Sequence, residues 1–273
     1  MDLDLAPTNS DGLRLRSPLI VASGALGYGV EYARTLSFEG VGALVSRTTS
    51  FQPRRSAAPP QLIETPAGLL YTGGDTNPGL RYLVQRCAPQ WASWGTPAIV
   101  SVGGATAEQC ADVAAQLEGV VGVAGVEFNL ARFAERAADA VRLVRAATTL
   151  PLVVKLPLDA PAIVALAQAA VASGADALAV SGPPLGLWID PASGERVEGW
   201  LCGPALLPLA LRAVAAVAAA VAVPIIGGGG VSTASAARQM LAAGATAVSV
   251  GAALLANPAL ASTLAAALHA PPG

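Results

Sequence analysis

The sequence predicts a single (β/α)8 TIM barrel, and three observations lead to that prediction. The chain has 273 residues, close to the roughly 250 that one such barrel occupies. Hydrophobic residues make up 53% of the chain and charged residues 12%, a composition that excludes a disordered protein. Short runs of branched apolar residues alternate with Ala/Leu-rich segments from end to end, as in a parallel sheet wrapped by helices. We therefore expect one α/β domain over residues 1–273.

The branched apolar runs supply the strands, and their number matches a closed barrel. Each run is four to six residues long, which is too short for a helix and typical of a buried parallel strand. The predicted strands are Pro18–Ser23, Ala43–Ser46, Ala98–Val102, Gly125–Asn129, Leu152–Leu156, Ala177–Ser181, Pro224–Gly227 and Ala247–Val250.

The Ala/Leu-rich segments between these runs supply the helices. The predicted helices are Glu31–Phe38, Ala107–Leu117, Phe133–Ala146, Ala160–Ser173, Ala205–Ala222 and Thr233–Ala243. Gly174 and Gly244 follow two of them and can take the positive φ that ends a helix. The stretch Leu206–Val223 is as apolar as a membrane span, but Arg212 interrupts it and a short strand follows, so we interpret it as a barrel helix.

Two connections, residues 47–79 and 182–202, are longer than ordinary loops. Both follow predicted strands, and extra length after barrel strands builds the mouth in which active sites lie. Within them, Thr65–Tyr71 and Trp188–Val197 have the pattern of small hairpins. We expect these insertions to close over the mouth.

Four consecutive glycines, Gly227–Gly230, lead from the seventh predicted strand into a helix. Without side chains, backbone N–H groups can approach an anion, and the helix dipole adds a favourable potential. Gly251 follows the eighth strand, and the loops after these two strands form the phosphate site of many barrels. Two tight turns are the alternative, but four glycines cost backbone entropy without an obvious packing reason. We predict a phosphate site.

Lys155 lies at the end of the fifth strand and is predicted to point into the barrel. A buried ammonium needs a negative partner, and the electron-rich edge of a reduced flavin is one. A structural pair with a barrel carboxylate such as Glu127 is the alternative. Asn129, at the end of the fourth strand, either contacts the same ring edge or caps the next helix.

Charge and cysteine content narrow the class of protein. The formal net charge is −2, and without a basic cluster there is no footprint for nucleic acid or for an anionic membrane. Met1 is followed by Asp2, Leu3 and Asp4 rather than by a signal peptide. Three scattered cysteines suit a reducing cytoplasm and supply no metal site. We expect a cytoplasmic protein of small-molecule chemistry, with enough apolar surface for a homo-oligomer.

Specific motifs then give a family resemblance that covers nearly the whole chain. The motifs in order are Pro18–Ala33, Thr48-Thr49, Pro53-Arg54, Glu64–Leu69, Asn77–Gly79, Glu127–Asn129, Val154–Leu156, Leu201–Ala205, Pro224–Gly230 and Ala245–Gly251. With these motifs the chain resembles the catalytic subunit of class 1 dihydroorotate dehydrogenases, especially the class 1B branch.

The resemblance implies a flavoprotein of pyrimidine biosynthesis that oxidises dihydroorotate to orotate. It also implies FMN at the barrel mouth and an iron-sulfur flavoprotein subunit that passes electrons to NAD. The residues that it implies as FMN contacts are Ala22, Ser23, Gly24, Asn129, Lys155, Gly203, Gly229, Gly230 and Gly251.

The chain departs from the family pattern in its substrate site. Ser46, with Arg47 next to it, stands where the family has a lysine, and Tyr71 replaces an orotate-binding asparagine. Gly182-Pro183 replaces Asn-Thr, and Asn129-Leu-Ala-Arg-Phe-Ala replaces the Asn-Ile-Ser-Cys-Pro-Asn motif of the catalytic-cysteine loop. Cys202 is poorly placed as a substitute base. The substrate contacts that we expect are Ser46, Arg47, Tyr71, Asp75 and Asn77.

These observations favour an FMN-dependent oxidoreductase that resembles dihydroorotate dehydrogenase, with dihydroorotate or an altered compound as its substrate and with an unidentified catalytic base. An inactive or flavin-free barrel that binds or scaffolds a partner is the main alternative. A barrel that binds a phosphorylated metabolite for isomerase or aldolase chemistry would use the same phosphate loops, but it would not explain the long family match.

Overall fold

The protein is a closed eight-stranded parallel barrel in a computed structural model that describes residues 3–55 and 60–269. The strands follow one another around the barrel in the order β3, β4, β7, β8, β9, β10, β13, β14, and the TIM-barrel prediction is confirmed. Their bounds are β3 Leu19–Val21, β4 Ala43–Val45, β7 Ala98–Val102, β8 Val123–Asn129, β9 Leu152–Pro157, β10 Ala177–Gly182, β13 Ile225–Gly228 and β14 Ala247–Val250.

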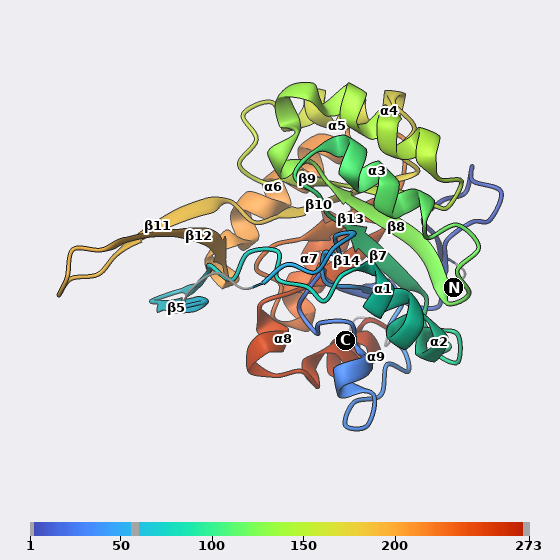
Figure 1. The fold of residues 1–273 in the computed structure, drawn as a ribbon. Helices are drawn as coiled ribbons and strands as arrows, with labels where there is room; N and C mark the ends of the chain where they lie inside the picture. Colours follow the sequence, from blue (N-terminus) through green and yellow to red (C-terminus); the bar gives the residue numbers. More distant parts are fainter. Residues whose placement is uncertain (1–2, 56–59, 270–273) are drawn as a thin grey trace.

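Helices surround the barrel (Figure 1). Their bounds are α3 Ala107–Ala115, α4 Ala137–Ala147, α5 Ile163–Ala172, α6 Leu207–Ala218, α7 Ala234–Ala242, α8 Ala253–Ala256 and α9 Leu260–His269. Five of the six predicted helices form, each within a few residues of its expected bounds. Gly174 and Gly244 take φ values of 103° and 106° after α5 and α7, as expected of residues that end a helix. In the described part of the chain, no helix is long and apolar enough to cross a membrane.

The predicted helix Glu31–Phe38 is wrong. Only the 3-10 turn η1 (Val30–Tyr32) forms there, and turns follow it. Tyr32, Thr35 and Ser37 are weak helix formers, and the segment is too short to offset them. The helical segment before β7 was not predicted: α1 (Leu80–Tyr82), a π turn η2 (Leu83–Cys87) and α2 (Ala88–Trp91) run without a break.

An N-terminal hairpin closes the amino end of the barrel. Its strands are β1 (Leu3–Asp4) and β2 (Arg14–Leu15), which pair antiparallel. Side chains of this segment, Leu5, Leu13 and Leu15, are at most 2% exposed and pack on the residues that fill the barrel interior. The barrel is therefore plugged at this end, and a ligand can enter only from the carboxyl ends of the strands.

The two insertions join into one four-stranded antiparallel sheet. Its strands are β5 (Leu62–Thr65), β6 (Gly68–Tyr71), β11 (Leu185–Ile189) and β12 (Arg196–Cys202), in the order β11, β12, β6, β5. Both predicted hairpins form, and Trp200 pairs with Tyr71 to connect them. The β11–β12 hairpin extends well beyond the barrel, on the left of Figure 1. We call this hairpin the arm.

Candidate active site

The residues singled out from the sequence meet at the carboxyl ends of the barrel strands. Parallel register places Asn129 of β8 beside Lys155 of β9, and Lys155 beside Ala179 of β10. The glycines that follow β13 and β14 end their strands at the same edge of the barrel. Because the opposite edge is plugged, this mouth is the place in the fold where catalytic groups are expected.

Lys155 and Glu127 form a buried pair at the base of the mouth. The Lys155 Nζ lies 3.6 Å from Glu127 Oε1, and their side chains are 10% and 5% exposed. This separation exceeds a hydrogen bond, and Glu127 Oε1 has no hydrogen-bond partner in the described part of the chain. The Lys155 ammonium likewise donates no hydrogen bond to a described residue. A purely structural pair with Glu127 would therefore leave the donors of Lys155 unused.

Asn129 is a helix cap in this structure. Its Oδ1 accepts a hydrogen bond of 3.0 Å from the Ala131 amide and so opens the 3-10 turn η3 (Leu130–Arg132). The capping role uses only the oxygen of the side chain. The Nδ2 amino group donates to no described residue and remains able to donate to a ligand.

The glycine turn after β13 has packing reasons that the sequence did not reveal. A Cβ on Gly228 would lie 2.1 Å from Ser249 Oγ, and one on Gly230 would lie 2.6 Å from the Leu207 nitrogen. Gly229 and Gly230 also have positive φ, at 113° and 76°. The argument that these glycines lack a packing role is therefore wrong. The turn still fits an anion, since the amides of Gly230 and Val231 find no acceptor among the described residues.

The other predicted cofactor contacts border the mouth with small residues. Ser23 Oγ donates to the Ser46 carbonyl at 2.9 Å. Gly24 has a φ of 76°, and a Cβ there would meet nothing within 4 Å, so the chain leaves open space at this point. A Cβ on Gly251 would meet only Ala22, at 3.5 Å. Gly203 packs its backbone directly against Gly68 and so joins the end of β12 to the start of β6.

Two of the predicted substrate contacts are occupied by protein groups. Ser46 is fully buried, its hydroxyl donates to the Arg47 carbonyl, and it accepts from the Ser101 amide. Asn77 is 4% exposed, and its side chain bonds Ser50 and the backbone on both sides of itself. These two side chains organise the loop walls, and their contact with a substrate remains a prediction.

Charged groups at the mouth form a cluster that was not predicted from the sequence. Asp75 Oδ2 lies 3.4 Å from Arg54 Nη1 and 3.2 Å from Arg132 Nη2. Arg47 donates to the carbonyl of Thr76, the residue that follows Asp75, at 3.2 Å. Three guanidinium groups and one carboxylate leave a net charge of two positive units. Arg54 and Arg132 were missed as site residues, because no spacing links segments 54, 75 and 132.

The remaining predicted contact, Tyr71, and the nearby thiol Cys202 are both turned toward protein groups. The Tyr71 hydroxyl donates to the Gly74 carbonyl at 3.3 Å. Burial raises the pKa of Cys202 to about 11, although the positive charge of Lys155 lowers it. The thiol therefore stays protonated near neutral pH and is a poor proton acceptor.

Comparison with known proteins matches the sequence of this chain to one family. The family model described as Dihydroorotate dehydrogenase matches residues 5–270. A protein of Desulforudis audaxviator, named Dihydroorotate dehydrogenase B (NAD(+)), catalytic subunit, is 41% identical over 275 residues, which covers 94% of this chain and 89% of the relative. A protein of Citrifermentans bemidjiense with the same name is 37% identical over 270 residues, covering 93% and 88%.

Proposed function

This chain belongs to the dihydroorotate dehydrogenase family, and from that membership we propose that it is an FMN-dependent catalytic subunit that oxidises dihydroorotate to orotate in pyrimidine biosynthesis. The observation that carries the proposal is the Lys155 ammonium. It lies at the base of the mouth with its hydrogen-bond donors unused, at the same edge of the barrel as turns whose backbone can hold a phosphate. A barrel that had lost its cofactor would have no need to keep a buried cation without a bonded partner.

The chain offers a place for each part of FMN. The Gly229–Val231 turn and the Gly251 turn would hold the phosphate through backbone N–H groups. Lys155 and the Asn129 amino group would donate to the polar edge of the ring, and Ala22, Ser23 and Gly24 would lie against it with little side-chain bulk. When bound, FMN supplies a two-electron acceptor for the hydride of the substrate.

The charged cluster at the mouth supports an anionic substrate. Dihydroorotate carries a carboxylate, and the Arg47, Arg54 and Arg132 guanidinium groups exceed the single Asp75 carboxylate by two charges. A bidentate guanidinium contact orients a carboxylate as well as attracting it. We propose that Arg132, at 55% the more exposed of the two arginines that pair with Asp75, turns from Asp75 to the substrate.

Two kinds of protein partner follow from the proposal. The relatives are named as catalytic subunits of an NAD(+) enzyme, so we propose an iron-sulfur flavoprotein subunit as the electron acceptor, and the cytoplasm as the compartment. We also propose a homo-oligomer. Leu185, Leu187 and Ile189 are 60%, 45% and 49% exposed and share one face of the arm. A projecting two-stranded hairpin with such a face needs a covering surface to be stable.

The visible spectrum of the purified protein, followed by anaerobic titration with dihydroorotate, tests the proposed function. We expect flavin absorption that bleaches as dihydroorotate is added. Flavin absorption that persists after dihydroorotate is added would support the assignment as a flavoenzyme and reject dihydroorotate as its substrate. A colourless protein that fails to take up added FMN would reject the flavoenzyme and leave the scaffold barrel as the better account.

A further inference from the structure

Glu127 is a buried carboxylate at the base of the mouth for which the proposed reaction has no use. It is 3% exposed, and it projects from β8 between Ser101 of β7 and Val153 of β9. The Ser101 hydroxyl pairs with Thr48 Oγ1 at 3.2 Å rather than with the carboxylate. Lys155, at 3.6 Å, is thus the group that compensates Glu127.

The two members of this pair differ in what they can reach. Glu127 Oε1 is sealed from solvent and has no hydrogen-bond partner among the described residues. Lys155 is on the mouth side, with its side chain twice as exposed, at 10% against 5%. A buried carboxylate without hydrogen bonds is unfavourable, so its persistence here needs a reason other than stability.

We propose that Glu127 is a positioning residue that holds the Lys155 ammonium at the base of the mouth and limits the positive charge that the flavin ring meets. The inference rests on the proposed FMN function. Because 3.6 Å is longer than a hydrogen bond, the Lys155 donors stay directed to the ligand while the negative charge of Glu127 acts through space. The Lys155–Glu127 pair attracts FMN less strongly than an isolated ammonium would. This loss of attraction is largest for the reduced, anionic form of FMN.

This arrangement has a measurable consequence for the reduction potential of bound FMN. A positive neighbour stabilises the reduced anion more than the neutral oxidised ring, so it raises the potential. Glu127 opposes that effect. Glu127→Gln keeps the shape of the side chain and removes its charge. We therefore expect the equilibrium ratio of reduced to oxidised FMN to be about tenfold higher in the variant than in the wild type. For a two-electron couple, tenfold corresponds to about 30 mV in the positive direction.

The experiment is a spectroelectrochemical titration of the FMN-loaded wild type and of FMN-loaded Glu127→Gln, with thermal melting of both. Glu118→Gln is the matched control, because the Glu118 carboxylate accepts hydrogen bonds from Thr148 and Thr149 at the plugged end of the barrel. We expect the control to lower the melting temperature and to leave the potential unchanged. We expect Glu127→Asp, which keeps the charge, to stay near the wild-type potential.

Three results would count against the inference. A Glu127→Gln potential equal to that of the wild type, or shifted to negative values, would overturn it and leave FMN binding intact. A melting temperature that falls without a change in potential would show a purely structural pair. A wild type that binds no FMN would overturn the proposed function itself, and the inference with it. Should Glu127→Gln fail to fold, Glu127→Asp carries the test, since a large shift of its potential also contradicts the inference.

Discussion

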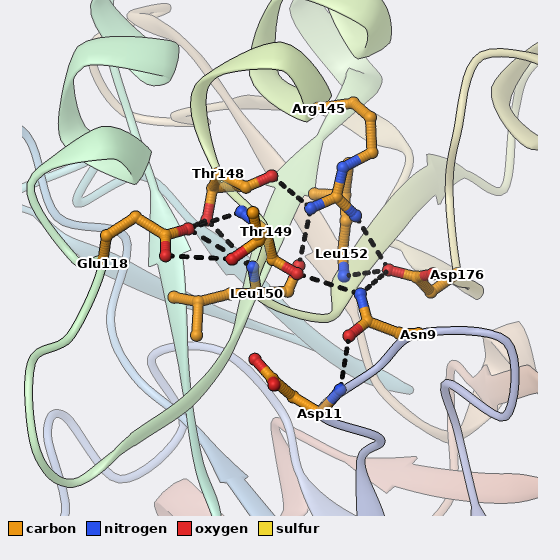
Figure 2. A network of polar contacts seen from close by, with 9 residues as sticks. All are labelled: Asn9, Asp11, Glu118, Arg145, Thr148, Thr149, Leu150, Leu152 and Asp176. Atoms are coloured by element: carbon orange, nitrogen blue, oxygen red, sulfur yellow. Dashed lines mark hydrogen bonds and ion pairs between the residues drawn. The ribbon is translucent and has the colours of Figure 1, made fainter.

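The two ends of the barrel treat buried charge in opposite ways. At the plugged end, Asp176 Oδ2 accepts hydrogen bonds from Asn9 at 3.2 Å, from Arg145 at 2.9 Å and from the Leu152 amide at 2.8 Å. Figure 2 shows these groups converging from the N-terminal segment, α4 and the starts of β9 and β10. The Arg145 guanidinium also bonds the carbonyls of Thr148 and Leu150.

Glu118 completes the network at the plugged end. Its carboxylate accepts from the hydroxyls of Thr148 and Thr149 and from the backbone amide of Thr149 (Figure 2). These hydrogen bonds lower the pKa of Glu118. The Asp176 and Glu118 carboxylates each accept from several donors, and the network joins the loops that precede three strands.

The mouth, in contrast, leaves its buried charge without hydrogen bonds. Glu127 and Lys155 are 3.6 Å apart and bond no described group. Barrels place stability at the amino ends of the strands and chemistry at the carboxyl ends. A polar group of the barrel can therefore be assigned to stability if the protein uses its hydrogen-bonding capacity, and to chemistry if the protein leaves that capacity unused.

The largest effect should come from breaking the network at the plugged end. Asp176→Ala leaves the Leu152 amide and the Arg145 guanidinium without their shared acceptor, so we expect the free energy of unfolding to fall by about 3 kcal/mol. Urea denaturation measures it. Asp139→Ala, which breaks an exposed pair with Arg142, should lower the free energy of unfolding by less than about 1 kcal/mol. Equal effects of the two variants would refute the assigned role of the network.

Replacing the mouth pair as a whole should affect ligand binding rather than folding. Lys155→Met with Glu127→Gln removes both charges, so we expect nearly wild-type stability and at least about tenfold weaker FMN binding, or about 1.4 kcal/mol. Fluorescence titration with FMN measures the affinity. Lys155→Met alone leaves an uncompensated buried carboxylate and should be the less stable of the two variants. Unchanged FMN affinity in the double variant would remove Lys155 from the site.

Alkaline pH should reveal the partly buried Cys202 thiol at the mouth. The pKa of Cys202 is about 11 in the folded protein and 9.0 in a model thiol. Because the folded pKa is raised, its contribution to stability is complete below about pH 9 and is lost as the pH rises toward 11. At pH 10 we expect Cys202 to account for about 1 kcal/mol of lost stability. Denaturation of Cys202→Ser should show a smaller fall between pH 8 and pH 10; an identical fall would contradict the burial of this thiol.

The smallest effect on stability should come from the exposed charges of the mouth. Arg132 is 55% exposed, so Arg132→Gln should lower the free energy of unfolding by less than about 1 kcal/mol. The loss of one cation should nevertheless raise the KM for dihydroorotate several-fold, as steady-state kinetics would show. Arg142→Gln on the outer helix α4 removes a cation that is 63% exposed and should leave KM unchanged. If both variants raise KM alike, the effect is one of overall charge.

Local sequence patterns were sufficient where one short segment decides the structure. The eight barrel strands, five of the outer helices and both hairpins could be predicted, because buried runs, helix formers and turn glycines act within a few residues. The family was also recognised from motifs alone. Prediction failed at Glu31–Phe38, where weak helix formers outweigh the apolar pattern. It also failed at Leu80–Trp91, where the burial of Leu80, Leu83 and Trp91 stabilises a helical segment that the sequence pattern did not reveal.

The sequence by itself determined the barrel, the position of its mouth and the presence of Lys155 and the glycine turns at that mouth. Only the tertiary structure decided how those groups are used. It showed that Gly228 and Gly230 are packed against neighbouring strands and helices, that Arg54, Arg132 and Asp75 meet, and that Glu127 and Lys155 approach without a hydrogen bond. The physical reason is that secondary structure follows from interactions over a few residues, whereas charge pairing depends on side chains brought together from distant segments.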